Sequence, residues 1–246
     1  MSNSATTIKL NPKIVLIILL ALSALLIGLS IRGQYLKYFP GTYDIHGAWG
    51  EFRIDLLMQG FYVDLEANIP SYFNTIILFI PALLLGSIAV WKFSIKDKFK
   101  IHWAGLALIF LYLSMDEAAA LHERLIKPMR SIVNFEGYSG LFYFAWVVPG
   151  IAVVLLFLLA YLRFFLHLEN KYKILFFISI ATYVSGIIGG EMISGHFAET
   201  IGLKNFEYAM FTSLEESLEW IGCSLIIYSL LLYIQQYLPE GITFKA

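Results

Sequence analysis

The sequence has few charged residues and a single cysteine. Charged residues make up 14% of the 246 residues, whereas hydrophobic residues make up 59%. A soluble domain is usually closer to half apolar and a quarter charged, so this composition predicts an integral membrane protein. The net charge of -1 offers no basic excess of the kind that nucleic-acid binding requires, and we expect no nucleic-acid partner.

Motifs that indicate a known chemistry are also missing. Cys223 has no second cysteine with which to form an intrachain disulfide. The sequence contains no cysteine-rich metal motif, no glycine-rich phosphate loop, and no GxSxG or HExxH pattern.

Long apolar runs are abundant. Six segments are long enough to cross a hydrocarbon core of about 30 Å, and each is expected to be a helix because lipid offers no other partner to the backbone. We place these spans at about 13–32, 71–92, 101–121, 139–163, 172–195 and 208–234. The predicted fold class is all-α: one polytopic integral membrane helix bundle, 1–246, with about six transmembrane helices.

The distribution of lysine and arginine predicts the orientation. With the N-terminus inside, the inner side carries ten of these residues and the outer side seven, and the short inner loop Trp91 to Lys100 is the most basic. We therefore expect both termini in the cytoplasm, in a bacterial or similar plasma membrane. The outer side would hold the loop 33–70 and the segment 122–138, and we expect short interfacial helices in both.

Acidic and histidine residues gather at the outer ends of four predicted spans, notably in the stretches YLSMDEAAALHERL, GGEMISGHFAET and FTSLEESLEWIG. At about 100° per residue, Glu215 and Glu219 share one helix face and Glu216 lies beside them. Carboxylates this close are costly in a low dielectric unless they take up protons, bind a cation or pair with basic side chains. Ionisable residues in a span therefore predict a functional site.

A metal site is the most economical interpretation of this pattern. Histidines and carboxylates without a thiolate suit zinc, iron or manganese, so we expect a divalent metal cofactor, although the spacing does not select the metal. The predicted ligands are His122, Glu123, Glu191, His196, Glu215 and Glu219. The predicted catalytic groups for proton transfer are Asp116 and Glu216.

The pattern as a whole predicts a membrane-embedded, metal-dependent hydrolase with membrane lipid as its partner and a lipid or small amphiphile as its substrate. The metal would lower the pKa of a bound water molecule, and a carboxylate would accept the proton. Two alternatives stay open. A proton or divalent-cation transporter would need a polar path to the inner side, and a non-catalytic membrane subunit or sensor would use the acids to bind a partner.

Overall fold

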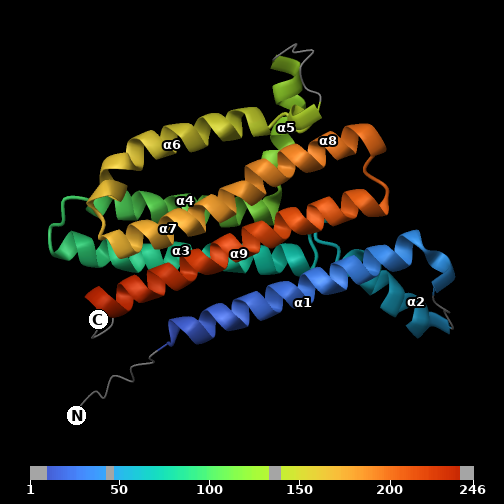
Figure 1. Ribbon diagram of the computed structural model, residues 1–246, viewed down its shortest axis with the longest axis horizontal. Coiled ribbons are helices and arrows are strands. Elements are labelled where there is room, and N and C mark those ends of the chain that lie inside the picture. The colour runs from blue at the N-terminus through green and yellow to red at the C-terminus, as the bar shows by residue number, and fades with distance from the viewer. Residues whose placement is uncertain (1–9, 43–46, 133–139, 239–246) are drawn as a thin grey trace.

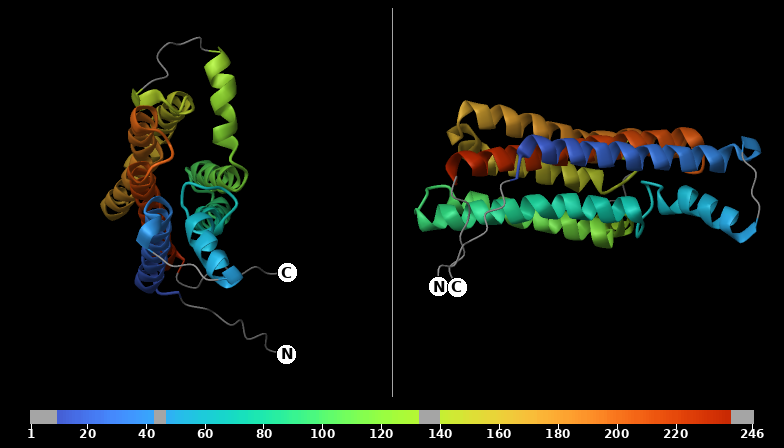
Figure 2. Two further views of the ribbon diagram at one scale, coloured as in Figure 1. Left: turned by 90° about the vertical axis from the view of Figure 1, so that its right-hand side faces the viewer. Right: turned by 90° about the horizontal axis from the view of Figure 1, so that it is seen from below.

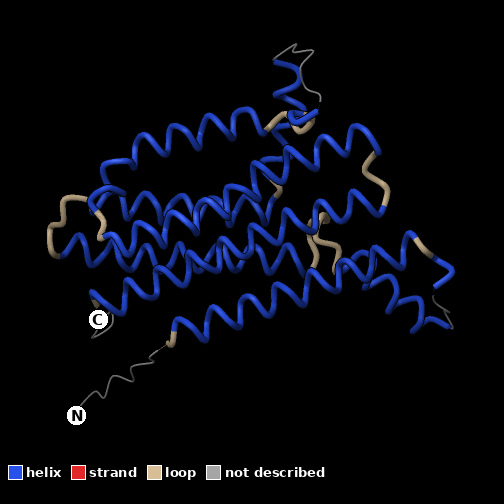
Figure 3. Tube along the Cα trace, in the orientation of Figure 1, coloured by secondary structure: helices blue, strands red, loops and turns tan. Residues whose placement is uncertain are grey.

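The computed structural model describes residues 10–42, 47–132 and 140–238. Within these residues every regular element is helical, which confirms the all-α prediction (Figures 1 and 3). The α-helices are α1 (Pro12–Tyr38), α2 (Gly47–Asp55), α3 (Ile69–Ser94), α4 (Lys100–Ala119), α5 (Leu121–Ile132), α6 (Val147–His167), α7 (Asn170–Val184), α8 (Glu191–Ile201) and α9 (Phe206–Tyr237). Short 3-10 or π-helical turns connect them: η1 (Pro40–Thr42), η2 (Leu56–Gly60), η3 (Gly140–Phe142) and η4 (Ser185–Gly190).

Five helical runs among the described residues are long and apolar enough to cross a membrane. They are α1, α3, α6, the continuous run of α7, η4 and α8 (Asn170–Ile201), and α9. The sixth predicted span, 101–121, forms helix α4, which packs along α3 but is not among these five. Asp116 and Glu117 lie in its last turns and reduce its apolar content.

The segments between the spans contain short helices, as expected, but the bounds of the neighbouring spans differ from the prediction. The predicted loop 33–70 begins inside α1, which continues to Tyr38, and then holds α2 and η2. The predicted span 139–163 begins only at Val147, because residues 140–142 form a 3-10 turn. In the segment 122–138, α5 accounts for the residues up to Ile132, and residues 133–139 lie outside the described part.

Asparagine side chains begin three of the long helices. Asn11, Asn68 and Asn205 each accept a hydrogen bond from a backbone N–H of the first helical turn, at 2.7–3.0 Å. Such a cap satisfies a donor that has no partner within the helix. Asn68 forms a full capping box with Ser71, whose hydroxyl accepts from the Asn68 N–H at 3.0 Å. Local sequence therefore determines where these helices start.

Helix α9 forms the centre of the bundle. It packs against α1, α3, α7, η4 and α8, and its residues Trp220, Cys223 and Leu230 are fully buried. Helix α6 lies at the periphery (Figure 1) and exposes large apolar side chains such as Leu159, which is 72% exposed. An exposed apolar surface of this kind is expected of a helix that faces lipid.

The two ends of the bundle differ in chemistry. The basic end comprises the turn 95–99 between α3 and α4, the turn 168–169 between α6 and α7, and the last turns of α9 (Figure 1). The acidic end comprises the loop 61–68 before α3, the junction of α4 with α5, helix α8 and the start of α9. Helix α5 projects across the bundle axis at the acidic end (Figures 1 and 2).

Candidate functional site

A cavity of about 340 Å³ lies among the helices at the acidic end. Helices α4, α8 and α9, turn η4, the loop 61–68 and the α4–α5 junction all contribute to its lining. The described residues that line it include eight acids and one histidine, and none of them is lysine or arginine. These nine are Asp64, Glu66, Asp116, Glu117, His122, Glu191, Glu215, Glu216 and Glu219.

Glycines of the π-helical turn η4 position two of the acids on α9. A Cβ atom added to Gly186 would lie 2.5 Å from Cγ of Glu219, and one added to Gly190 would lie 2.7 Å from Cγ of Glu215. Only glycine permits this approach, because any side chain would occupy the space of the glutamate stems. π-Helical turns are frequent at functional sites, where they shift the register of a helix. Here the turn seats Glu215, which is 7% exposed, against the wall of the cavity.

Glu191 joins this group from the first turn of α8. Its Oε1 atom accepts a hydrogen bond from Nε1 of Trp146 at 3.0 Å, and its carboxylate lies close enough to that of Glu215 for the two charges to interact. Two ionised carboxylates repel each other when they are this close, and a cation between them would relieve the repulsion. Trp146 therefore holds a carboxylate of the cavity in place.

Asp116 orients His122 at the junction of α4 with α5. Ala120 adopts a left-handed conformation with φ of 47° and ends α4, so that the chain changes direction between α4 and α5. The Oδ1 atom of Asp116 accepts a hydrogen bond from the backbone N–H of His122 at 2.9 Å. The Oδ2 atom lies 2.9 Å from Nδ1 of the same histidine. The imidazole also packs edge-on against Trp146, with ring centroids 5.2 Å apart. A carboxylate that fixes one ring nitrogen is the usual support of a metal-binding histidine.

A buried amide stands beside Glu117. Asn74 on α3 is 1% exposed, and neither polar atom of its side chain has a hydrogen-bond partner among the described residues. Its amide is nevertheless the polar neighbour of the Glu117 carboxylate. An amide left without partners in the interior costs about 1–3 kcal/mol, and the Glu117 carboxylate is the neighbouring group that can accept from it.

The mouth of the cavity lies in the loop 61–68. Asp64, Leu65 and Glu66 are exposed there, and the hydroxyl of Tyr208 donates to Asp64 at 3.5 Å. Burial, together with the negative charge of Asp64, raises the pKa of Tyr62 above its ordinary value. A phenol is neutral at physiological pH at its ordinary pKa, and here its proton is held still more tightly beside Asp64.

The opposite side of the cavity is closed by the apolar core. Leu78 and Tyr183 form part of its lining, and beyond them Ile77, Cys223 and Ile226 are at most 4% exposed. Gly222 allows α9 to pack closely against α7 here, since a Cβ on it would lie 2.4 Å from the backbone nitrogen of Tyr183. In this structure the cavity therefore communicates with one end of the bundle.

Most of the residues expected to form the site do line this cavity. Asp116, His122, Glu191, Glu215, Glu216 and Glu219 are brought together from α4, α5, α8 and α9. His196 is exposed on α8 and is not among the lining residues. Glu123 lies in α5, but its side chain is outside the described part of the structure.

The arrangement of the carboxylates also bears on the expected metal. Among the described residues, no three His, Cys, Asp or Glu side chains are placed to hold one ion. The acids surround the cavity rather than converge on a point within it.

Four contributors to the site were not expected from the sequence: Asp64, Glu66, Glu117 and Asn74. Asp64 and Glu66 read as solvated loop residues because they precede a span. Asn74 could have been recognised from the sequence, since a single amide in an apolar helix requires a hydrogen-bond partner. Glu117 follows Asp116 directly and could not be assigned to a face without the helix packing.

Comparison with protein families provides one match. Residues 14–234 match the family described as "Domain of unknown function (DUF8692)". The chain belongs to this family. The match covers most of α1, most of α9 and the chain between them, and therefore every described residue of the cavity. No curated protein and no solved structure matches the chain.

Proposed function

We propose that the chain is a membrane-embedded hydrolase that acts on a lipid or other amphiphile in the acidic cavity, with the help of a divalent metal ion. The observation that carries this proposal is the lining of the cavity: eight acids and a histidine, with no lysine or arginine among the described residues. A volume of about 340 Å³ is within the range of small-molecule sites and leaves space for a substrate group beside an ion.

The need for positive charge supports a cation. Ionised carboxylates in a low dielectric repel one another, and the charges of Glu191 and Glu215 are close enough to interact. Lysine or arginine side chains could neutralise these carboxylates, but the described lining residues contain neither. A divalent cation would neutralise two of the charges and is therefore the more effective counter-charge.

Four residues form the proposed ligand set: His122, Glu191, Glu215 and Glu219. Asp116 holds both the backbone N–H and the ring of His122, so we assign it an orienting role in place of the proton-accepting role expected from the sequence. Glu216 then remains as the proton acceptor. Since these side chains do not converge in the structure, binding requires the glutamate carboxylates to turn toward the ion about their terminal side-chain bonds, while the stems of Glu215 and Glu219 stay against η4. When bound, the metal would supply a water molecule of lowered pKa.

The surroundings of the mouth favour an amphiphilic substrate. Leu65 is 40% exposed and Leu203 46% exposed at the edge of the cavity, beside the acids Asp64 and Glu66. A lipid could place its polar group among the carboxylates while its chains stay against these apolar side chains. We also infer that α4 is a sixth membrane pass, because it runs antiparallel to α3 and returns the chain from the basic to the acidic end (Figure 1).

Transport across the membrane has less support. A transporter needs a polar path that reaches the basic end, whereas the core beyond the cavity is filled by residues such as Ile77, Cys223 and Leu230. The hydroxyl of Ser179 lies 3.4 Å from that of Ser229, but these two groups are isolated within apolar packing.

Metal content measured by mass spectrometry on detergent-purified protein tests the proposal. We expect about one zinc, iron or manganese ion per chain, reduced in Glu215→Gln and retained in Glu207→Gln, an exposed glutamate on the same helix. A screen of fluorogenic lipid esters with and without chelator then tests hydrolysis. Absence of metal from the wild-type protein would overturn the mechanism. Metal without hydrolysis would favour the non-catalytic subunit, and cation flux into proteoliposomes would favour the transporter.

A further inference from the structure

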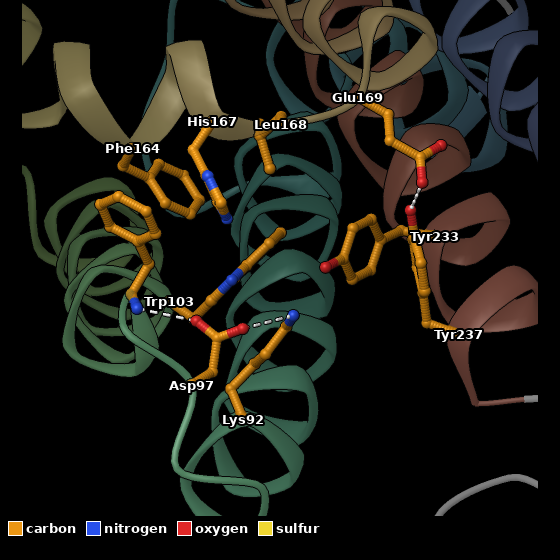
Figure 4. Close-up of a pocket in the computed structure, with 10 residues that line it drawn as sticks. Lys92, Asp97, Trp103, Phe164, His167, Leu168, Glu169, Tyr233 and Tyr237 are labelled. Carbon is orange, nitrogen blue, oxygen red and sulfur yellow. Dashed lines mark hydrogen bonds and ion pairs between the residues drawn. The ribbon is translucent and has the colours of Figure 1, made fainter.

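A second cavity, of about 180 Å³, lies at the basic end of the bundle (Figure 4). The last turns of α3, α6 and α9, the start of α4 and the two turns of this end provide its lining. In Figure 4, Lys92 and Asp97 lie on one side and Glu169 lies on the other, with Tyr233 between them. The cavity thus places charged side chains around a wall of aromatic rings.

Lys92 is the positive charge inside this cavity. Its side chain is only 12% exposed, and its Nζ donates to Asp97 at 2.9 Å. The same Nζ lies 4.6 Å from the ring centre of Trp91 and 5.9 Å from that of Tyr233. An ammonium group has three donors, and the bond to Asp97 uses one of them.

The carboxylates are held in place by other groups. Asp97 accepts from the backbone N–H of Phe99 at 2.7 Å as well as from Lys92. Burial opposes the ionisation of Asp97, but these bonds and the charge of Lys92 outweigh it and hold the pKa of Asp97 below its usual range. Glu169 accepts from the hydroxyl of Tyr237 and from the amide of Gln236 at 3.3 Å.

The surroundings of the cavity are strongly positive. Within the segments 92–100 and 163–173 there are seven lysines and arginines and two acids. The basic residues are Lys92, Lys96, Lys98, Lys100, Arg163, Lys171 and Lys173. Basic sites between helices at the end of a membrane span are where anionic headgroups bind.

We propose that this cavity binds the headgroup of an anionic phospholipid that carries hydroxyl groups, of the phosphatidylglycerol type. Lys92 and the imidazole of His167 would bind the phosphate, and the Asp97 and Glu169 carboxylates would accept hydrogen bonds from the glycerol hydroxyls. The aromatic wall, which includes Trp103 and Phe164, would pack against the carbon atoms of the headgroup. This ligand matches both signs of charge in the cavity, since it offers acceptors to Lys92 and donors to the carboxylates.

Native mass spectrometry of the detergent-purified protein, titrated with phosphatidylglycerol and with phosphatidylcholine, tests this site. We expect phosphatidylglycerol to bind at least about tenfold more tightly, and Lys92→Met to remove about tenfold of its affinity, as for the loss of a charge-assisted contact. Lys171→Met removes the same charge from an exposed position at this end, outside the cavity, and should change the affinity less than about threefold.

Three controls decide the remaining outcomes. Because Lys92→Met leaves Asp97 without its partner, His167→Gln serves as a second variant at an exposed position and should also weaken binding. Soluble glycerol phosphate is titrated alongside, and affinity equal to that of the lipid would overturn a lipid site in favour of a soluble phosphate ligand. Equal binding of phosphatidylethanolamine, or equal loss in Lys171→Met and Lys92→Met, would also overturn the proposal.

Discussion

Replacing Gly186 by alanine is expected to push α9 away from η4 and disturb the acidic cavity. The new Cβ would lie 2.5 Å from Cγ of Glu219, 2.9 Å from its backbone nitrogen and 3.0 Å from the carbonyl oxygen of Glu215. The Cγ atom can rotate aside, but the two backbone atoms can yield only if the whole helix shifts. The clash therefore acts on the two helices that hold the carboxylates together.

The expected cost follows from two opposing effects. Overpacking a tight contact costs about 1–3 kcal/mol, whereas alanine gains about 1 kcal/mol over glycine within a helix. Because two of the three close atoms belong to the backbone, we expect the cost to prevail, with a net loss of about 1–2 kcal/mol in the free energy of unfolding. Gly189 provides the matched control in the same turn, since nothing lies within 4 Å of a Cβ placed there. Gly189→Ala should gain about 0.5–1 kcal/mol.

Thermal unfolding in a mild detergent measures the difference between the two variants. At roughly 2–4 °C for each kcal/mol in a chain of this size, Gly186→Ala should melt about 3–12 °C below Gly189→Ala. Binding of the proposed cation should weaken in Gly186→Ala alone, because only this substitution displaces the glutamates. Equal melting temperatures would refute the close packing of η4 against α9 on which the description of the cavity depends.

Three further predictions concern single hydrogen bonds and charges. The pKa of Asp97 in the folded protein lies below its ordinary value of 3.8. The stability that ionised Asp97 contributes is therefore present above pH 3.8 and is lost as the pH falls through the lower, folded-state pKa. Thermal unfolding of Asp97→Asn across this acid range should not show this pH-dependent loss of stability. Asp116→Asn should lower the free energy of unfolding by about 1 kcal/mol, because the charge-assisted bonds to His122 are weakened, and an unchanged denaturation midpoint would contradict the orienting role. Trp146→Phe removes the donor to Glu191 and should reduce metal affinity about tenfold by calorimetry, whereas equal affinity would exclude this tryptophan from the site.

The fold was predictable to the extent that apolar length determines it. Runs of about 20 apolar residues can satisfy their backbone in lipid only as helices, and five of the six expected spans are helices that meet this description. In the described part of the chain, helix α4 is the one expected span that is not among these five. It is helical and packs along α3, yet its last turns carry two acids, so length and composition alone do not establish it as a span.

The cavity was predictable as a group of acids at one end, but not as a set of contacts. Helical periodicity brought Glu215, Glu216 and Glu219 to neighbouring positions, and the structure places all three in the lining. His196 does not line the cavity, because it lies on the exposed face of α8. The left-handed turn at Ala120 changes the direction of the chain and places His122 beside Asp116. No glycine or asparagine marks this turn in the sequence, so it could not be predicted.

The position of the acids within the bundle argues for function over stability. Carboxylates in an interior cost free energy that well-packed apolar side chains of similar size would not, and the other end of α9 shows that this sequence can build such a core, with Ile227 and Leu230 at most 1% exposed. The glycines of η4 add to the cost by giving up apolar contact in order to admit the glutamate stems. A chain that needed only a stable bundle would gain from leucine at these positions. The apolar half of the bundle therefore supplies the stability, and the acidic half uses part of it to hold an unfavourable cluster of charges around a cavity that opens to one side.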